Sequence, residues 1–203
     1  PEWVPVEGGT YATQAGVDYK HDTVTPTNTW DNMTLFDFEG NALSSMKILN
    51  QPTENLIENA SFEIDGITNT PSGWNVWTND AENPVAVKTE YGNAFDGDYK
   101  LTFWDYEAYD CSVYKTFTGI PNGTYSFSVW AMTNGDQDCL QLYAKNYGGE
   151  ELNTTITTSD INWNIYTIDE IEVTNNECEI GIYTEAGVDD WCNLDFAMFR
   201  LVE

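Results

Sequence analysis

Short runs that alternate apolar and polar residues are the feature that most limits how this chain can fold. Between residues 124 and 132, Tyr125, Phe127, Val129 and Ala131 fall on one side of an extended strand. Turn-forming stretches such as Pro121-Asn122-Gly123 separate this run from similar ones. The other predicted strands are 100–104, 111–119, 139–145, 164–173, 177–184 and 192–202. We therefore expect an all-β fold, an antiparallel two-sheet β-sandwich of the jelly-roll type.

The charge of the chain restricts its partners. Among 203 residues, 34 acidic and 7 basic side chains give a formal net charge of −27, and 14% of the residues are aromatic. A disordered acidic chain would be poor in aromatic residues, so we assign the acidity to a folded domain. The charge repels nucleic acid and anionic membranes, and no apolar run approaches the roughly 20 residues of a membrane helix. Neutral ligands and cations remain, and we expect a secreted, extracellular monomer.

The first 50 residues follow a different pattern. A short amphipathic helix is predicted over 41–49, because apolar residues recur there at a spacing near 3.6, namely Ala42, Leu43, Met46 and Leu49. A segment this short cannot bury a core alone. We therefore interpret 1–50 as a remnant of a larger domain, 51–55 as a linker and 56–203 as the sandwich.

Aromatic and acidic residues in predicted loops and strand ends form the candidate ligand site. An aromatic ring stacks on the apolar C–H face of a neutral sugar, and carboxylate or amide groups bind the sugar hydroxyls. Stacking one sugar face of roughly 80 Å² contributes about 2 kcal/mol. Core packing is the alternative, and we expect it for Trp74 and Trp130. The residues expected to bind the ligand are Trp77, Trp104, Asp105, Tyr109, Asp189, Asp190 and Trp191.

No residue pattern indicates catalysis. Retaining glycosidases need two carboxylates roughly 5–5.5 Å apart, and nothing singles out such a pair among the 34 acidic residues. The single histidine, His21, lacks an accompanying nucleophile motif. We therefore expect no catalytic residues and no enzyme activity in this chain.

Several stretches between residues 56 and 203 carry a resemblance to a known family. They are LIENASFEIDG at 56–66, PNGTYSFSVWAM at 121–132, LQLYAKNYGGEE at 140–151, CEIGIYTEAGVDDW at 178–191 and CNLDFAMFRL at 192–201. Together they resemble a jelly-roll carbohydrate-binding module of family 61, which recognises β-1,4-galactan. The resemblance implies a non-catalytic module that binds pectic galactan or galacto-oligosaccharides.

The same resemblance implies a structural calcium ion as cofactor. Calcium takes six to eight oxygen ligands, from both carboxylates and backbone carbonyls. The implied ligands are the carboxylates of Glu63 and Asp195 and carbonyls near Ser61, Lys100 and Asp195. The alternative is that Glu63 and Asp195 are ordinary solvated carboxylates.

Residues 1–49 are similar to a different family. PEWVPV and TWDNMTLFDFEGNALSSM resemble the C-terminal end of a family 53 glycoside hydrolase, an arabinogalactan endo-β-1,4-galactanase with a TIM barrel. The two resemblances together imply a module that targets an attached galactanase whose catalytic residues lie outside this sequence. Two alternatives stay open: a calcium-stabilised structural or adhesive sandwich without a glycan site, and a small stand-alone glycosidase.

Four cysteines leave the disulfide pattern open, and buried thiols are an alternative to bridges. If all four pair, they allow three connectivities. In a jelly-roll order we expect the strands that begin at Cys111, Cys139 and Cys178 to start at the same end of the sandwich. This arrangement favours a bridge among these three and leaves Cys192 outside it.

Overall fold

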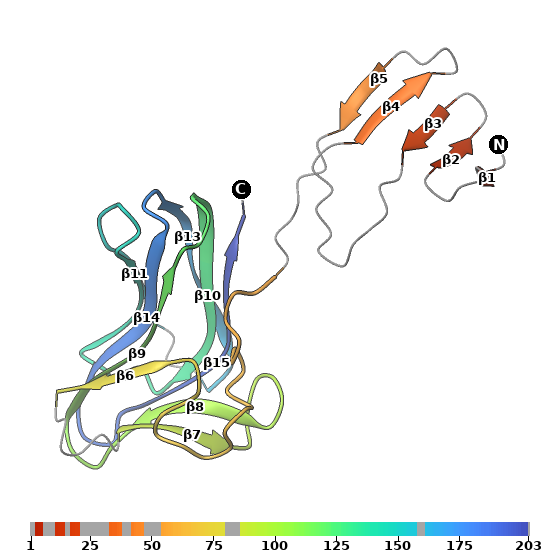
Figure 1. Cartoon of the computed structure of the whole chain (residues 1–203). Coiled ribbons are helices and arrows are strands. Elements are labelled where there is room, and N and C mark those ends of the chain that lie inside the picture. Colours follow the sequence, from red (N-terminus) through yellow and green to blue (C-terminus); the bar gives the residue numbers. More distant parts are fainter. Residues whose placement is uncertain are drawn as a thin grey trace. The chain divides into compact units, whose positions relative to one another are not determined.

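The computed structural model divides into two units, Pro1–Gln51 and Pro52–Glu203 (Figure 1). It describes residues 54–79, 86–157 and 161–202 with their side chains, and five strands within residues 1–53. These five strands form one antiparallel sheet in sequence order. They are β1 (Trp3–Pro5), β2 (Tyr11–Gln14), β3 (Val17–Lys20), β4 (Met33–Asp37) and β5 (Ala42–Met46).

The helix predicted over 41–49 is wrong, because β5 occupies most of that segment and pairs antiparallel with β4. Gly40 and Asn41 lie between the two strands in the sequence, and both residue types favour turns. Ser44 and Ser45 are also weak helix formers. Pairing with β4 therefore outweighs a helical spacing that rests on four apolar residues. Residues 41 and 47–49 of the predicted helix lie outside the described residues.

The second unit is a sandwich of two five-stranded sheets (Figure 1). One sheet has the order β13 (Asn164–Val173), β10 (Gly123–Thr133), β15 (Trp191–Leu201), β8 (Tyr99–Trp104) and β7 (Val87–Tyr91). The other has the order β12 (Leu152–Thr155), β11 (Cys139–Lys145), β14 (Glu177–Ala186), β9 (Tyr109–Thr118) and β6 (Asn75–Thr78). All neighbouring strands are antiparallel, which confirms the predicted fold class. The described residues contain no apolar helix of membrane-spanning length.

All seven predicted strands of the sandwich are present, while three further short strands of the sandwich escaped prediction. β6, β7 and β12 have four, five and four residues, and each lies at the edge of its sheet. Strands of four or five residues offer few positions for a clear alternation, whereas β13, which also lies at an edge, has ten residues and was predicted. Longer central strands such as β10 bury a full inward row and were predicted to within a residue or two.

The core lies between the inward rows of the two sheets. The residues Tyr125, Phe127, Val129 and Ala131 are at most 1% exposed, which confirms the side of β10 on which they were placed. The Phe199 ring of β15 stacks on Tyr125 with a centroid distance of 4.9 Å. Burial of each large apolar side chain contributes roughly 1.5–3 kcal/mol, so this layer holds the two sheets together.

Asn55 ties the start of the sandwich to its last strand. Its Oδ1 atom accepts the N–H groups of Ile57 at 3.2 Å and Phe199 at 2.9 Å, and its Nδ2 donates to the Ala197 carbonyl at 2.8 Å. A side-chain amide can satisfy backbone groups on two segments at once. Asn55 therefore fastens the start of the sandwich to β15.

The expected placement of the cysteines is wrong. Cys111 and Cys139 lie at one end of their sheet, opposite Thr184 and Glu185 of β14, whereas Cys178 at the start of β14 lies at the other end. The reason is that β14 runs antiparallel to both β9 and β11. All four cysteines are free thiols. Burial raises the pKa of all four thiols, with a smaller effect of nearby Cys192 on Cys111, so these thiols stay protonated.

Two isoleucines test whether the inward rows carry the stability. Ile182 of β14 is fully buried, and Ile67 is 72% exposed. We expect Ile182→Ala to lower the free energy of unfolding by roughly 2–5 kcal/mol, because it removes buried methyl groups and leaves a cavity. The matched substitution Ile67→Ala should stay within roughly 0.5 kcal/mol of the parent. Urea unfolding measures both values, and similar losses for the two variants would contradict this core.

Candidate functional site

A groove lies on the outer face of the sheet that contains β11, β14 and β9. On these three strands, core residues alternate with residues that point away from the core. The groove has a volume of about 430 Å³, within the roughly 300–1,000 Å³ of typical ligand sites. Its lining residues are Trp77, Ser112, Tyr114, Gln141, Tyr143, Lys145, Glu151, Glu179 and Tyr183.

Tyr143 forms the floor of the groove, because its cross-strand partner Gly181 leaves space for the ring. A Cβ atom at Gly181 would lie 2.5 Å from the Tyr143 ring. The Tyr143 hydroxyl forms a hydrogen bond with Ser112 at 3.1 Å and donates to Glu179 Oε1 at 3.4 Å. Burial raises the pKa of Tyr143, so the hydroxyl stays protonated and keeps these contacts. The floor is therefore a fixed, flat aromatic surface.

The charged groups of the groove leave it slightly negative. Lys145 Nζ lies 3.1 Å from Glu179 Oε1 and 4.7 Å from the centroid of the Tyr143 ring. Thr116 also donates to Glu179 Oε2, at 3.4 Å. Lys145 balances one of the two lining carboxylates, and Glu151 supplies the other. The groove thus disfavours anionic ligands and can accept neutral ones.

Two aromatic rings form one side of the groove. Trp77 on β6 is 48% exposed, and its ring centroid lies 6.4 Å from that of Tyr183 on β14, with a 34° angle between the planes. Large exposed rings of this kind offer apolar surface next to hydrogen-bonding groups. Gln141 on β11 adds an amide to the lining. The groove therefore combines the aromatic and polar groups that a sugar ring needs.

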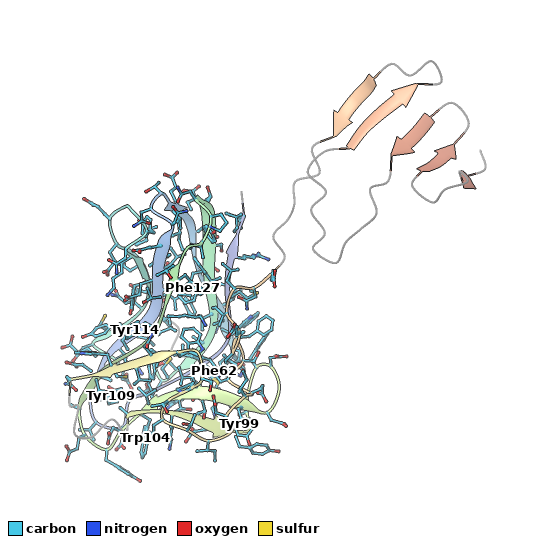
Figure 2. All side chains as sticks on the ribbon, in the orientation of Figure 1. Phe62, Tyr99, Trp104, Tyr109, Tyr114 and Phe127 are labelled. Atoms are coloured by element: carbon cyan, nitrogen blue, oxygen red, sulfur yellow. The ribbon has the colours of Figure 1, made fainter. Side chains whose placement is uncertain are left out.

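Of the other predicted ligand residues, Tyr109 begins β9 of the groove's own sheet, and the rest lie on the opposite sheet or in the loops next to it. Trp104 and Trp191 face each other across β8 and β15. The Asp189 N–H donates to the Asp105 carbonyl at 3.1 Å, so the two loops that follow Trp104 and precede Trp191 are joined. The structure thus brings these residues together, while it places Trp77 in the groove on the other sheet. Figure 2 labels Trp104 and Tyr109 among the predicted ligand residues and Tyr114 in the groove.

Tyr109 and Asp190 make their contacts within the protein. Tyr109 is 5% exposed, and its hydroxyl donates to the Asp190 carbonyl at 2.8 Å. The Asp190 carboxylate accepts the Gly187 N–H at 2.9 Å and the Asn134 side-chain amide at 3.1 Å. These bonds hold the turn before β15 in place. Their geometry gives both residues a positioning role for the neighbouring loops.

Asp195, an implied calcium ligand, is fully buried and accepts three backbone N–H groups. Its Oδ2 accepts those of Phe95 at 2.7 Å and Asp96 at 2.9 Å, and its Oδ1 accepts that of Phe196 at 2.7 Å. Burial raises the pKa of Asp195 to about 6, although the three N–H groups favour the charged form. The carboxylate therefore holds the loop of residues 92–98 against β15.

Glu63 and Ser61 contact the same loop. Glu63 Oε1 accepts the N–H groups of Asp98 at 2.9 Å and Tyr99 at 2.7 Å. The Ser61 hydroxyl donates to Asp96 Oδ2 at 2.8 Å. The loop is thus bound by two carboxylates, that of Glu63 near the start of the sandwich and that of Asp195 in its last strand. Charge-assisted hydrogen bonds of this kind are stronger than neutral ones.

The Lys100 side chain also contacts this loop. Its Nζ donates to the Gly92 carbonyl at 3.0 Å, so the ammonium group helps to close the loop. The register between β8 and β15 ends at Leu101 and Leu194, which leaves Lys100 and Asp195 beyond the paired region. The oxygens available here are of the kind that calcium prefers. Among the described residues, however, no three His, Cys, Asp or Glu side chains gather into a metal cluster, so backbone carbonyls would have to provide most ligands.

Sequence reasoning missed most of the groove. Tyr114, Gln141, Tyr143, Glu179 and Tyr183 all sit in predicted strands, whereas ligand residues were sought in loops and strand ends. The available signal was the outward row of each strand, where polar and aromatic residues recur at every second position on three neighbouring strands. Strand order was needed to bring these rows together, and it cannot be read from one sequence.

No protein-family model and no curated protein matches this chain. Among solved structures, it is similar to the carbohydrate-binding module TmCBM61 in complex with β-1,4-galactotriose, with 25% identity and a TM-score of 0.63 over 73% of this chain and 99% of that one. This likeness supports a carbohydrate-binding role, and it is consistent with a chain that binds rather than cleaves a glycan.

Two further structures share the fold alone. The enzymatically active domain of bacteriophage CBA120 tailspike protein 4 is 12% identical, with a TM-score of 0.57 over 73% of this chain and 21% of that one. The K3 cleaved adhesin domain of Lys-gingipain from Porphyromonas gingivalis W83 is 14% identical, with a TM-score of 0.51 over 69% of this chain and 95% of that one.

Two glycines of the same loop test the contact with Glu63. Gly97 and Gly92 have φ angles of +72° and +85°, but a Cβ at Gly97 would lie 2.5 Å from the Glu63 carboxylate, whereas at Gly92 it meets nothing within 4 Å. We expect Gly92→Ala to cost roughly 1–2 kcal/mol for the left-handed backbone. Gly97→Ala should cost more, because it also displaces Glu63 from the loop. Urea unfolding compares the two, and equal losses would show that Glu63 does not hold the loop.

Proposed function

We propose that this chain is a carbohydrate-binding module for β-1,4-galactan and that the glycan lies in the groove over β11, β14 and β9. The observation that carries the proposal is the aromatic groove on a sandwich that is similar to TmCBM61, whose structure contains β-1,4-galactotriose. The groove has a volume of about 430 Å³, which is typical of a site that encloses a whole ligand. It therefore suits a short stretch of a polysaccharide chain.

Each part of the groove has a role in this proposal. Trp77 and Tyr183 stack on the apolar faces of sugar residues, and each stacked face contributes about 2 kcal/mol. Sugar hydroxyls are bound by the Gln141 amide and by the hydrogen-bonding capacity that Glu179 and Lys145 do not use in their ion pair. The excess negative charge favours a neutral galactan over an acidic polysaccharide.

The module would serve an enzyme to which it is attached. We propose that it targets an endo-β-1,4-galactanase to pectic galactan outside the cell, in line with the resemblance of residues 1–49 to the end of such an enzyme. Tethering raises the local concentration of the enzyme on its substrate without a new catalytic contact. In this role the chain itself needs no catalytic residues.

We also propose that calcium stabilises the loop of residues 92–98. The support is the gathering of oxygen atoms from Ser61, Glu63 and Asp195 around that loop, together with the end of the pairing between β8 and β15 at Leu101. A cation there would offset the cost of burying the Asp195 carboxylate. The ion would be structural and would lie outside the groove.

A single substitution tests the groove. We expect Trp77→Ala to weaken the binding of β-1,4-galactotriose roughly 30-fold, because about 2 kcal/mol of stacking is lost. The control is Tyr91→Ala, which removes another exposed ring, 67% exposed on β7, that does not line the groove. Isothermal titration calorimetry gives both dissociation constants. Unchanged affinity in Trp77→Ala would place galactan elsewhere.

Calcium can be tested by melting. At 100-fold excess over its dissociation constant, a bound ion adds about 2.7 kcal/mol, which raises the melting temperature of a domain of this size by roughly 5–10 °C. We expect a chelator to remove this increment from the parent chain. Glu63→Gln keeps an oxygen for the Asp98 and Tyr99 N–H groups but loses the charge, so it should melt at one temperature with or without calcium. If the chelator leaves the melting temperature of the parent chain unchanged, calcium binding is contradicted. Glu63 and Asp195 are then hydrogen-bond acceptors only.

A further inference from the structure

A second depression lies on the outer face of the other sheet, between β7, β8 and β15. Its volume is about 230 Å³, roughly half that of the groove. On β8, the lining residues Lys100, Thr102 and Trp104 alternate with the core residues Leu101 and Phe103. The depression therefore opens away from the core, on the side of the sandwich opposite to the groove. We call it the indole pocket.

Two tryptophans form one side of the indole pocket. Trp104 and Trp191 are direct partners in the register of β8 and β15, so both indoles leave the sheet side by side. Tyr106 packs edge-on against Trp104 with a centroid distance of 4.4 Å, and Lys88 Nζ lies 5.5 Å from the centre of the Trp104 ring. These contacts hold the Trp104 indole in one orientation. Such a rigid apolar wall is a suitable surface for one face of a sugar ring.

The floor of the pocket is polar and buried. The Thr102 hydroxyl lies 2.9 Å from Glu90 Oε2 and 2.9 Å from Asn193 Oδ1. A hydroxyl has one proton, so Thr102 donates to only one of these oxygens at a time. The oxygen that receives no proton from Thr102 keeps its acceptor capacity, which a ligand hydroxyl in the pocket can use. Thr102 and Asn193 are themselves less than 9% exposed, so their positions are set by the sheet.

The carboxylate of the floor is charged. Burial acts to raise the pKa of Glu90, but hydrogen bonds from Lys88 and Thr102 and the charges of Lys88 and Lys100 outweigh it and lower the pKa. Lys88 Nζ lies 2.8 Å and Lys100 Nζ 3.7 Å from Glu90. Both ammonium groups are engaged by the protein, and the ionised Glu90 can accept hydrogen bonds from ligand hydroxyls.

We infer that the indole pocket is a second carbohydrate site, which holds a single neutral pyranose residue. Trp104 and Trp191 stack on the apolar face of the sugar, while Glu90, Thr102 and Asn193 bind its hydroxyl groups. The smaller volume limits the pocket to one residue, whereas the groove takes a longer stretch. Because the two sites lie on opposite faces, one module can hold two glycan segments at the same time, and the second contact adds avidity.

Indole N–H signals in nuclear magnetic resonance spectra of the full chain report on both sites separately. We expect D-galactose to shift the signals of Trp104 and Trp191, and β-1,4-galactotriose to shift these and that of Trp77. If only Trp77 responds, the groove stands and the second site is wrong. If only Trp104 and Trp191 respond, the second site stands and the groove is wrong. If D-galacturonate shifts the signals of Trp104 and Trp191 but D-galactose does not, the inference of a neutral ligand is wrong.

Variants separate binding from folding. We expect Thr102→Val, which keeps the shape of the side chain, to weaken the galactose response of Trp104 roughly 3- to 10-fold through the lost hydroxyl. Trp104→Ala should abolish the galactose response of Trp191 and leave the Trp77 response to galactotriose unchanged. Trp77→Ala is the reciprocal control and should leave the Trp104 response intact. An unchanged galactose response of Trp104 in Thr102→Val would rule out the polar floor as part of a site.

Discussion

Burial of the inward rows of the two sheets is the interaction on which the rest of the sandwich depends. Val113, Leu142 and Ile182 lie fully buried on three neighbouring strands, and Phe127 faces them from the other sheet's inward row. Because side chains alternate along a strand, a register that buries these residues also determines which residues point outward. A slip of one residue would exchange the two rows and would bury the groove residues. The groove is therefore a direct consequence of the core and needs no separate folding element.

The loop of residues 92–98 shows how a strongly acidic chain uses its carboxylates structurally. Asp195 and Glu63 together accept four of their five backbone hydrogen bonds from this loop and the strand start that follows it. The loop in turn places the Phe95 ring on Trp130, with a centroid distance of 3.9 Å. Asp195 can reach the loop because a register shift interrupts the pairing of β10 and β15 next to it, where Phe196 has a φ of +46°. The irregularity in β15 is thus the reason that Asp195 can bind the loop.

The sequence predicts those parts of the structure that depend on local periodicity. The long central strands and the inward row of β10 follow from alternation, and the fold class follows from their number. Short strands such as β6 escape because four residues offer too few positions for a clear alternation. The helix prediction over 41–49 failed because pairing with β4 outweighs a local spacing. The groove escaped for a different reason: Tyr143 depends on Gly181 of a strand distant in sequence, and only the strand order joins the two.

The two outer faces use the same residue types with opposite local charge. In the groove, Lys145 faces the two carboxylates Glu179 and Glu151, whereas around the indole pocket Lys88 and Lys100 surround the single carboxylate Glu90. The chain has only seven cationic residues and a net charge of −27. Two of these seven lie beside one small pocket, which is a high local concentration of positive charge. There they keep Glu90 ionised and support the Trp104 indole, which a surplus of nearby carboxylates would not do. The acidic remainder of the surface repels anionic polymers at longer range, and both ammonium groups beside the indole pocket are already paired with Glu90. These charges are the reason that we propose neutral glycans for both faces.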